Sequence, residues 1–315
     1  MPKFVRPRFS IVVPTRNEEA NVERMASTLI EQMALVGEES FDIIFIDNAS
    51  DDRTVEIVKT LAARDSRIRL IVNARNFGQM RSPTHGIFQA RGEAIISLCA
   101  DFQDPPTLIP AFVERWRAGT AIVLGVREAE ATSARLAFFR KISYWFAAKF
   151  NDYPVVRNAT GFGLYDAKVV QAIKQMREPE PFFRGMLVET GYSIETIPYF
   201  RPPRLGGRSN NNFFALLDFM LSSLASGSKK VIRLPFYGGA VAMIAALLTI
   251  PVGLVATLLG ASGWTFFWFF LFEFHFALLY LALGVLGDQV RLISERTRQT
   301  PLVIERERIN FPDDY

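Results

Sequence analysis

Short apolar runs alternate with longer amphipathic segments in the first part of the chain. The runs are rich in β-forming residues and end in polar residues, which is typical of buried strands followed by loops. They are Ser10–Val13, Phe41–Ile46, Arg69–Val72, the run that begins at Ile95, and Ala121–Leu124. The segments between them predict helices at Ala20–Val36, Thr54–Arg64, Met80–Ala90 and Leu108–Ala118. This βαβα alternation predicts an α/β fold with a doubly wound, mostly parallel sheet.

The polar residues that follow these runs are the candidate functional residues. The run beginning at Ile95 ends in Asp101, Gln103 and Asp104, and two prolines then prevent the strand from continuing. Because ligands of open α/β sheets bind at the carboxyl ends of strands, we expect these side chains at an active-site edge. Their oxygen atoms suit a divalent metal ion. Turn chemistry alone would explain one acidic loop, but polar groups after several strands favour a functional site.

Several motifs follow one another in an order and spacing that extend over essentially the whole chain. They are VVPTRNEE at 12–19, FIDNASDDRT at 45–54, ARNFGQ at 74–79, ADFQDPP at 100–106, GVR at 125–127, TGFGLYD at 160–166, RPPRLGGRS at 201–209 and PLVIERERINF at 301–311. Together they resemble the family 2 glycosyltransferases, in the branch of polyprenyl-phosphate enzymes that includes dolichol-phosphate-mannose-synthase-like and bactoprenol glycosyltransferase-like proteins. The resemblance implies the GT-A fold, a Rossmann-like doubly wound mixed sheet.

The resemblance also implies roles for individual residues. The residues expected to bind the nucleotide sugar, most often a UDP-sugar, are Pro14, Thr15, Arg16, Asn17, Glu18, Asp47, Asn48, Asn76, Asp101, Arg204 and Arg208. Asp101 and Gln103 are expected to hold Mg²⁺ or Mn²⁺ on the diphosphate. Asp101, Arg127 and Arg140 are the expected catalytic residues, and Arg127, Arg140 and Ser143 the expected ligands of the acceptor phosphate. A phosphate acceptor is already anionic, so no general base is required.

Two single positions and one short segment depart from the family pattern. Cys99 stands where the first aspartate of Asp-x-Asp is usual, and Asn48 stands where a second carboxylate is usual. Thr160–Gly163 replaces a Gly-Asp-Phe-Arg sequence, which indicates a different sugar or acceptor. Because a thiol is a poor ligand for Mg²⁺ or Mn²⁺, we expect weaker metal binding that depends on Asp101, Gln103, diphosphate oxygens and water. Cys99 is expected to be a packing residue.

Apolar residues are concentrated late in the chain, which is 50% hydrophobic overall. Residues 236–260 form an uncharged run, and 264–286 form a second run broken only by Glu273 and His275. Each is long enough to cross a hydrocarbon core of roughly 30 Å, so two transmembrane helices are predicted. The expected order is a glycosyltransferase domain at 1–211, an interfacial region at 212–234, the two helices within 235–287, and a tail at 288–315 that packs on the domain.

Two of these segments have alternative interpretations. Residues 212–234 are expected to form an amphipathic helix on the bilayer surface, but an ordinary buried helix would show a similar apolar face. The tail is expected to form a strand, although its alternating charges also suit a solvated edge. Glu273 and His275 are interpreted as contacts between helices or subunits, and a homo-oligomer is expected because two helices offer little intramembrane interface.

Charge gives the expected orientation. Lys229, Lys230 and Arg233 precede the first apolar run, and Arg291, Arg296 and Arg298 follow the second. Basic flanks stay on the cytoplasmic side, so the catalytic domain and the tail are expected there, on a bacterial-type inner (plasma) membrane. The first eight residues lack the apolar core of a signal peptide. A single cysteine excludes an intrachain disulfide. The pI near 9.2 suits an anionic bilayer, and no nucleic-acid partner is expected.

The sequence therefore predicts an inverting glycosyltransferase that moves a sugar from a nucleotide sugar to a polyprenyl phosphate for the cell envelope. A processive polysaccharide synthase would need more apolar spans and a Q-x-x-R-W motif, which Arg115-Trp116 does not complete. A catalytically silent membrane scaffold is the alternative suggested by Cys99 and Asn48. A membrane-tethered glycosyltransferase with a non-lipid acceptor is the third possibility, and it predicts activity that is independent of lipid phosphate.

Overall fold

The computed structural model describes residues 6–128, 156, 158–179, 181–201, 264–298 and 301–311. These residues fall into two compact units. The described residues from 6 to 201 and from 301 to 311 form a sheet unit, and 264–298 belong to the second unit. Arg140, Ser143, Arg204, Arg208, the interfacial region 212–234 and the first apolar run 236–260 all lie outside the described residues.

The sheet unit is built on one mixed eight-stranded sheet with the order β7-β5-β6-β4-β1-β2-β3-β8. Its strands are β1 (Phe9–Thr15), β2 (Phe41–Asp47), β3 (Ile68–Asn73), β4 (Ala94–Ser97), β5 (Ile122–Arg127), β6 (Ala159–Asp166), β7 (Ile194–Tyr199) and β8 (Glu305–Ile309). Only β6 and β8 run antiparallel to their neighbours. The predicted α/β class with a doubly wound mixed sheet is confirmed, and the first five strands lie where the apolar runs predict them.

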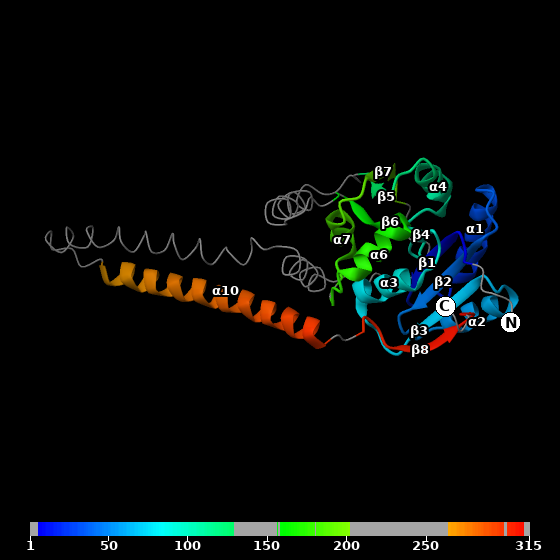
Figure 1. Ribbon diagram of the computed structural model, residues 1–315. Helices are drawn as coiled ribbons and strands as arrows, with labels where there is room; N and C mark the ends of the chain where they lie inside the picture. Colours follow the sequence, from blue (N-terminus) through cyan, green and yellow to red (C-terminus); the bar gives the residue numbers. More distant parts are fainter. Residues whose placement is uncertain are drawn as a thin grey trace. The chain divides into compact units, whose positions relative to one another are not determined.

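Helices cover both faces of this sheet (Figure 1). The first face carries α1 (Val22–Leu35), α2 (Thr54–Arg64) and α4 (Ile109–Arg117), which follows the short 3₁₀ turn η1 (Pro106–Leu108); the second carries α3 (Gly78–Gln89), α6 (Ala167–Gln175) and α7 (Phe183–Glu189). Ile11 and Val13 of β1 pack in the core of the first face, and Val12 packs in the core of the second. Burial on both faces explains why these strands are continuous apolar runs rather than alternating ones.

The predicted strand in the tail forms and closes one edge of the sheet. β8 pairs antiparallel with β3 and lies beside it in Figure 1. His85 on α3 lies 2.6 Å (Nε2 to Oε1) from Glu305 at the start of β8. Lys59 on α2 lies 2.6 Å (Nζ to Oε2) from Glu307. The strand is therefore held from both faces of the sheet, and His85 bonds to a distant strand rather than within its own helix.

Acid is expected to loosen this edge strand. Partial burial alone would raise the pKa of Glu305, but hydrogen bonds from His85 and Arg308 outweigh it and lower the pKa to about 2 from the ordinary 4.5. A lowered pKa stabilises the fold above pH 4.5, and that stabilisation is lost as the pH falls toward 2. Hydrogen exchange, corrected for intrinsic rates, should show that β8 amides lose protection over this range before β1 amides do. In Glu305→Gln the difference between β8 and β1 should not change with pH; a wild-type β8 that follows β1 throughout would contradict the prediction.

The described part of the second unit is a single 35-residue helix, α10 (Trp264–Arg298). It starts where the second apolar run predicts but continues beyond the predicted end at Leu286. His275 lies 2.8 Å (Nδ1 to O) from the carbonyl of Leu271, one turn earlier in its own helix. Within the residues that the structure describes, no helix combines the length and apolarity that a membrane span requires. The two predicted transmembrane helices are therefore not confirmed.

Candidate active site

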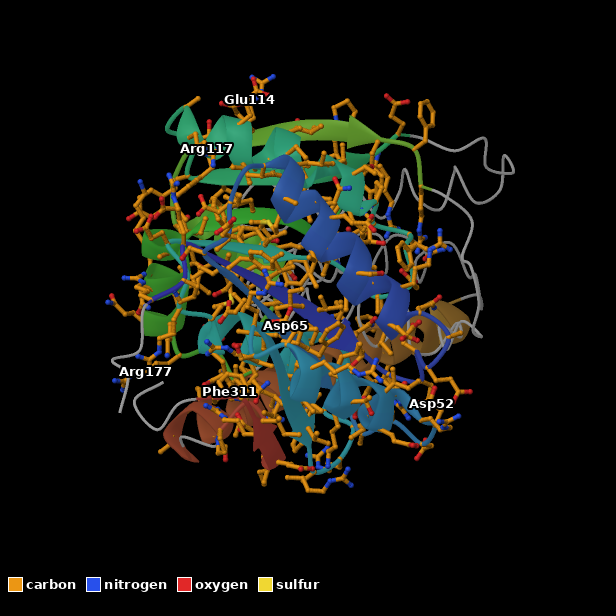
Figure 2. The ribbon with its side chains drawn as sticks, turned by 90° about the vertical axis from the view of Figure 1, so that its right-hand side faces the viewer. Asp52, Asp65, Glu114, Arg117, Arg177 and Phe311 are labelled. Atoms are coloured by element: carbon orange, nitrogen blue, oxygen red, sulfur yellow. The ribbon has the colours of Figure 1, made fainter. Side chains whose placement is uncertain are left out.

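Six strands of the sheet run in the same direction, so their carboxyl ends meet at one edge. The residues at these ends are Thr15, Asp47, Asn73, Ser97, Arg127 and Tyr199. Asp52, which follows β2, lies at one side of the sheet unit, and Arg117 and Arg177 lie at the opposite side (Figure 2). The edge that carries these strand ends is where ligands bind in α/β sheets, and it collects most of the polar residues that the sequence singles out.

Two strand-end loops form one wall of this edge because they bond to each other. The backbone N–H of Asn17 donates to Ser50 Oγ at 2.9 Å, and that of Glu18 donates to Thr54 Oγ1 at 2.8 Å. Asn17 and Ala49 have φ values of 55° and 58°, a region that side chains other than glycine adopt only when neighbouring contacts hold them. The wall is therefore preformed, and its shape depends on both loops together.

Asp47 lies at the base of this wall and is fully buried. Its carboxylate accepts the backbone N–H of Ser50 at 2.9 Å and the Ser50 hydroxyl. Burial raises the pKa of Asp47 and the charge of Asp52 adds to this effect, while the Ser50 hydrogen bonds and the charge of Arg306 oppose it. The carboxylate thus shapes the loop that follows β2.

The loop after β4 carries the acidic residues. Asp101 is nearly buried, and its Oδ1 accepts the backbone N–H of Gln103 at 3.1 Å. Phe102 between them has a φ of 58°, an unusual conformation for a bulky residue that fits a functional loop. Cys99 is an exposed residue, but withdrawal of its thiol from water and the charges of Asp104 and Asp101 raise the pKa of the thiol well above its ordinary value. Cys99 is therefore a neutral thiol at neutral pH, not a nucleophile.

Arg127, at the end of β5, reaches the same loop. Its Nε donates to the hydroxyl of Tyr199 at 3.3 Å, and its Nη2 lies 3.9 Å from Asp104 Oδ1. Tyr199 ends the neighbouring strand β7 and donates to Asp104 Oδ1 at 2.8 Å. A guanidinium, whose planar fork suits carboxylate and phosphate groups, therefore lies next to the acidic loop.

The profile of "Glycosyl transferase family 2" matches residues 10–171, half of the chain. A prophage bactoprenol glucosyl transferase homolog of Escherichia coli is 33% identical over 237 residues, which cover 74% of this chain and 76% of that protein. The chain belongs to glycosyltransferase family 2. As predicted, its similarity lies with the bactoprenol-type branch, since the bactoprenol glucosyl transferase of Shigella phage SfV is also 32% identical over 235 residues, 74% of this chain and 76% of that one.

Further comparisons extend over more of the chain at lower identity. An uncharacterized glycosyltransferase of Synechocystis is 29% identical over 305 residues, which cover 94% of this chain and 93% of that protein. Among solved structures, a Pyrobaculum calidifontis mannosyltransferase in complex with GDP-Man and Mn²⁺ is 15% identical with a TM-score of 0.43, covering 89% of this chain and 88% of that one. Glucosyl-3-phosphoglycerate synthase of Mycobacterium tuberculosis is 17% identical with a TM-score of 0.49, covering 72% and 85%.

In this glycosyltransferase, the strand-end edge brings together most of the predicted site residues that the structure describes. Those that lie on the wall or at its base are Pro14, Thr15, Arg16, Asn17, Glu18, Asp47, Asn48 and Asn76, and those near the acidic loop are Asp101, Gln103 and Arg127. Gln103 differs from its predicted role as a metal ligand in one respect. Its side-chain carbonyl accepts a hydrogen bond from Arg201, just after β7, so it also connects two strand ends.

Asn48, one of the residues predicted to bind the nucleotide sugar, bonds to the loop before α3. Its Nδ2 donates to Asn76 Oδ1 at 2.7 Å and to the carbonyl of Gly78 at 3.2 Å. Its Oδ1 accepts from the backbone N–H of Phe77 at 2.8 Å and from Asn73 Nδ2 at 3.2 Å. Both amide hydrogens and both oxygen lone pairs are used within the protein. The amide fixes the loop before α3, which a carboxylate lacking donors could not do.

Asn48→Asp is expected to destabilise the protein by about 1–3 kcal/mol, because a buried carboxylate would face two acceptors that have lost their donors. Acid should reverse part of the loss, since a protonated carboxyl regains one donor. The new carboxyl would have a raised pKa in the folded state, so its penalty disappears as the pH falls below that pKa. Thermal unfolding of the variant and the wild type at several pH values measures this. A stability difference that does not change with pH would contradict this explanation.

Sequence reasoning gave no site role to Tyr199, Arg201 or Arg306, and it noted Asp104 only as part of the acidic loop. Tyr199 and Arg201 reach the site edge because β7 pairs in parallel with β5, and the sequence carries no local signal of that pairing. Arg306 lies where the β3–β8 register shifts, and its charge offsets part of the rise that burial causes in the pKa of Asp47. Irregular pairing of this kind often re-aims a side chain near a site.

The family implies a divalent metal ion, and the acidic loop offers a limited set of donors for one. Asp101 supplies a carboxylate, whereas both oxygens of Asp104 are engaged by protein groups and Cys99 is a neutral thiol. In the described part of the chain, no three His, Cys, Asp or Glu side chains gather closely enough to hold a metal. These donors fit a hard cation held by one carboxylate, substrate phosphates and water, as is common for Mg²⁺.

Proposed function

We propose that this glycosyltransferase moves a sugar from a nucleotide sugar, with UDP as the expected nucleotide, to a polyprenyl phosphate, with inversion at the anomeric carbon. The observation that carries the proposal is that Asp104 connects the loop of Asp101 with Arg127. Asp101 belongs to an acidic loop suited to a diphosphate-bound cation, and Arg127 carries a guanidinium suited to a phosphate. The bactoprenol-type relatives support the lipid acceptor.

The proposed chemistry divides between the two sides of the site. Asp101 would hold Mg²⁺ or Mn²⁺, which when bound stabilises the negative charge that develops on the departing nucleotide. Arg127 would hold the acceptor phosphate in line with the anomeric carbon, and an acceptor oxygen attacks as the bond to the nucleotide breaks. The phosphate enters as an anion, so no protein group has to remove a proton. The wall formed by the loops after β1 and β2 would hold the nucleoside.

We also propose that the enzyme works at the cytoplasmic face of a bacterial-type inner membrane, in the service of the cell envelope. Support comes from the uncharged run at 236–260, the apolar run at 264–286 and the basic residues that flank them. The amphipathic region 212–234 would lie at the bilayer surface and bring the site to the phosphate of the lipid. A homo-oligomer is part of this proposal.

The test uses the full-length protein reconstituted in lipid with labelled nucleotide sugars, Mg²⁺ or Mn²⁺, and a polyprenyl phosphate. We expect label from one donor to enter the lipid phase, and EDTA to abolish this. The matched control is the same polyprenol without its phosphate, which should receive no label. Transfer to a water-soluble acceptor instead would contradict the lipid acceptor. Absence of transfer from every donor, with nucleotide binding retained, would favour the silent scaffold.

A further inference from the structure

Asp104 is a buried carboxylate that the proposed reaction does not use. It is 3% exposed, its Oδ1 accepts from the Tyr199 hydroxyl at 2.8 Å, and its Oδ2 accepts from the backbone N–H of Cys99 at 3.4 Å. Burial raises its pKa, and the hydrogen bond from Tyr199 and the charge of Arg127 oppose that rise. A carboxylate bonded on both oxygens would lose protein contacts if it bound a cation. Asp104 therefore holds other protein groups in place rather than a metal ion.

Tyr199 is held by packing as well as by its hydroxyl. Its ring meets Phe162 edge to face, with centroids 5.5 Å apart. A Cβ at Gly125 would lie 2.6 Å from the Phe162 ring and 3.1 Å from the Tyr199 ring, so the glycine of the GVR motif makes room for both. Burial and the charge of Asp104 raise the pKa of Tyr199 to about 12. The phenol therefore stays protonated and keeps donating to Asp104.

These contacts fix the direction of the Arg127 guanidinium. Its Nε donates to the Tyr199 oxygen, and its Nη2 faces Asp104. The side chain is still 28% exposed, so part of it is accessible from solvent. An arginine side chain loses considerable rotamer entropy when it is ordered, and two buried partners supply that order before any ligand arrives.

We propose that Asp104 and Tyr199 are positioning residues that hold Arg127 in the orientation that receives the acceptor phosphate. Asp104 also binds the backbone at Cys99, two residues before Asp101, so one carboxylate aligns the acceptor side of the site with the donor side. This inference rests on the proposed function of Arg127. It assigns to Asp104 and to Tyr199 at the end of β7 a role in acceptor binding without direct contact with substrate.

The test is a kinetic comparison of Tyr199→Phe with the wild type, using reconstituted protein and polyprenyl phosphate. Phenylalanine keeps the ring packing and removes only the hydroxyl. We expect the KM for the acceptor to rise about tenfold, the effect of losing a hydrogen bond to a charged group, while the KM for the nucleotide sugar stays unchanged. Asp104→Asn, which keeps the shape of the side chain, should raise the same KM. Tyr192→Phe is the matched control, because Tyr192 is 38% exposed and lies outside the site.

A double-mutant cycle with Arg127→Lys separates positioning from simple packing. If Tyr199 acts through Arg127, the Tyr199→Phe change should have little further effect in an Arg127→Lys background. Additive effects, or an unchanged acceptor KM in Tyr199→Phe, would overturn the inference while leaving the proposed function intact. Failure of the wild type to label polyprenyl phosphate would instead refute the proposed function, and with it the premise of this inference.

Discussion

Asp101→Asn is expected to lower sugar transfer about a thousandfold, which corresponds to about 4 kcal/mol of transition-state stabilisation. Asparagine can still accept the hydrogen bond that Gln103 donates to Asp101, so the loop should keep its shape. The substitution removes the negative charge of residue 101. Among the described residues of this loop, Asp101 is the carboxylate whose chemistry fits a diphosphate-bound cation. The measurement is the initial rate of label transfer to lipid at saturating Mg²⁺ or Mn²⁺.

The control for this substitution is Asp65→Asn. Asp65 precedes β3, at the end of the sheet opposite the site, and its carboxylate pairs with Arg67 near the surface. Surface pairs of this kind contribute roughly 0–1 kcal/mol, so activity should stay at the wild-type level. Binding of the nucleotide sugar without metal should also be similar in Asp101→Asn and the wild type. Asp101→Asn activity within a fewfold of the wild type would remove Asp101 from the catalytic assignment.

Gly163→Ala is expected to destabilise the sheet unit by about 3 kcal/mol, the upper part of the usual range for overpacking. Gly163 lies in β6, between β4 and β5, and an added Cβ would lie 2.2 Å from the carbonyl oxygen of Val123 and 3.2 Å from the Cα of Leu124. Both atoms belong to the backbone of a neighbouring strand, so relief would require the strands to separate. Thermal unfolding should show a Tm lowered by roughly 10 °C.

Gly284→Ala provides the comparison for this prediction. Gly284 lies in α10, and no described atom lies within 4 Å of the Cβ that alanine would add. Alanine also favours helix over glycine, so the substitution should leave the stability unchanged or raise it slightly. A Gly163→Ala protein as stable as the wild type would show that the sheet tolerates a side chain at this position.

The geometry at Gly163 also gives a structural reason for the departure from the family pattern at Thr160–Gly163. The family pattern has an arginine at the position of Gly163 and an aspartate two residues earlier, at the position of Gly161. Gly161 has a φ of +91°. The β5 backbone occupies the space of a side chain at 163, and a positive φ disfavours one at 161. Neither missing group can be replaced at these positions without changing the strand itself.

Local pattern was sufficient for the central sheet and for much of the site. Thr54–Arg64 was predicted with both ends of α2 correct, and the apolar runs lie within or next to the first five strands. These elements are buried on both faces, so hydrophobicity alone marks them. Because parallel strands expose the same end, Asp47, Asp101 and Arg127 were also predicted to lie at one edge.

The residues that sequence reasoning missed depend on pairing between distant strands. Tyr199 belongs to β7, whose side chains are only partly buried and so give a weak apolar signal. Its contact with Asp104 spans 95 residues and follows from β7 lying beside β5. The role of Asn48 was missed for another reason, since an amide that uses every donor and acceptor internally has the same sequence signature as one that binds a ligand.

The position of β8 has a consequence for the order in which the protein can be made. The catalytic sheet ends with a strand that is synthesised after α10, and 220 residues separate His85 from its partner Glu305. Until the ribosome has made that strand, β3 is an unpaired edge, and such edges are sites of aggregation. The last strand therefore makes completion of the catalytic unit depend on prior synthesis of the second unit, and a nascent chain truncated before it should need chaperone protection.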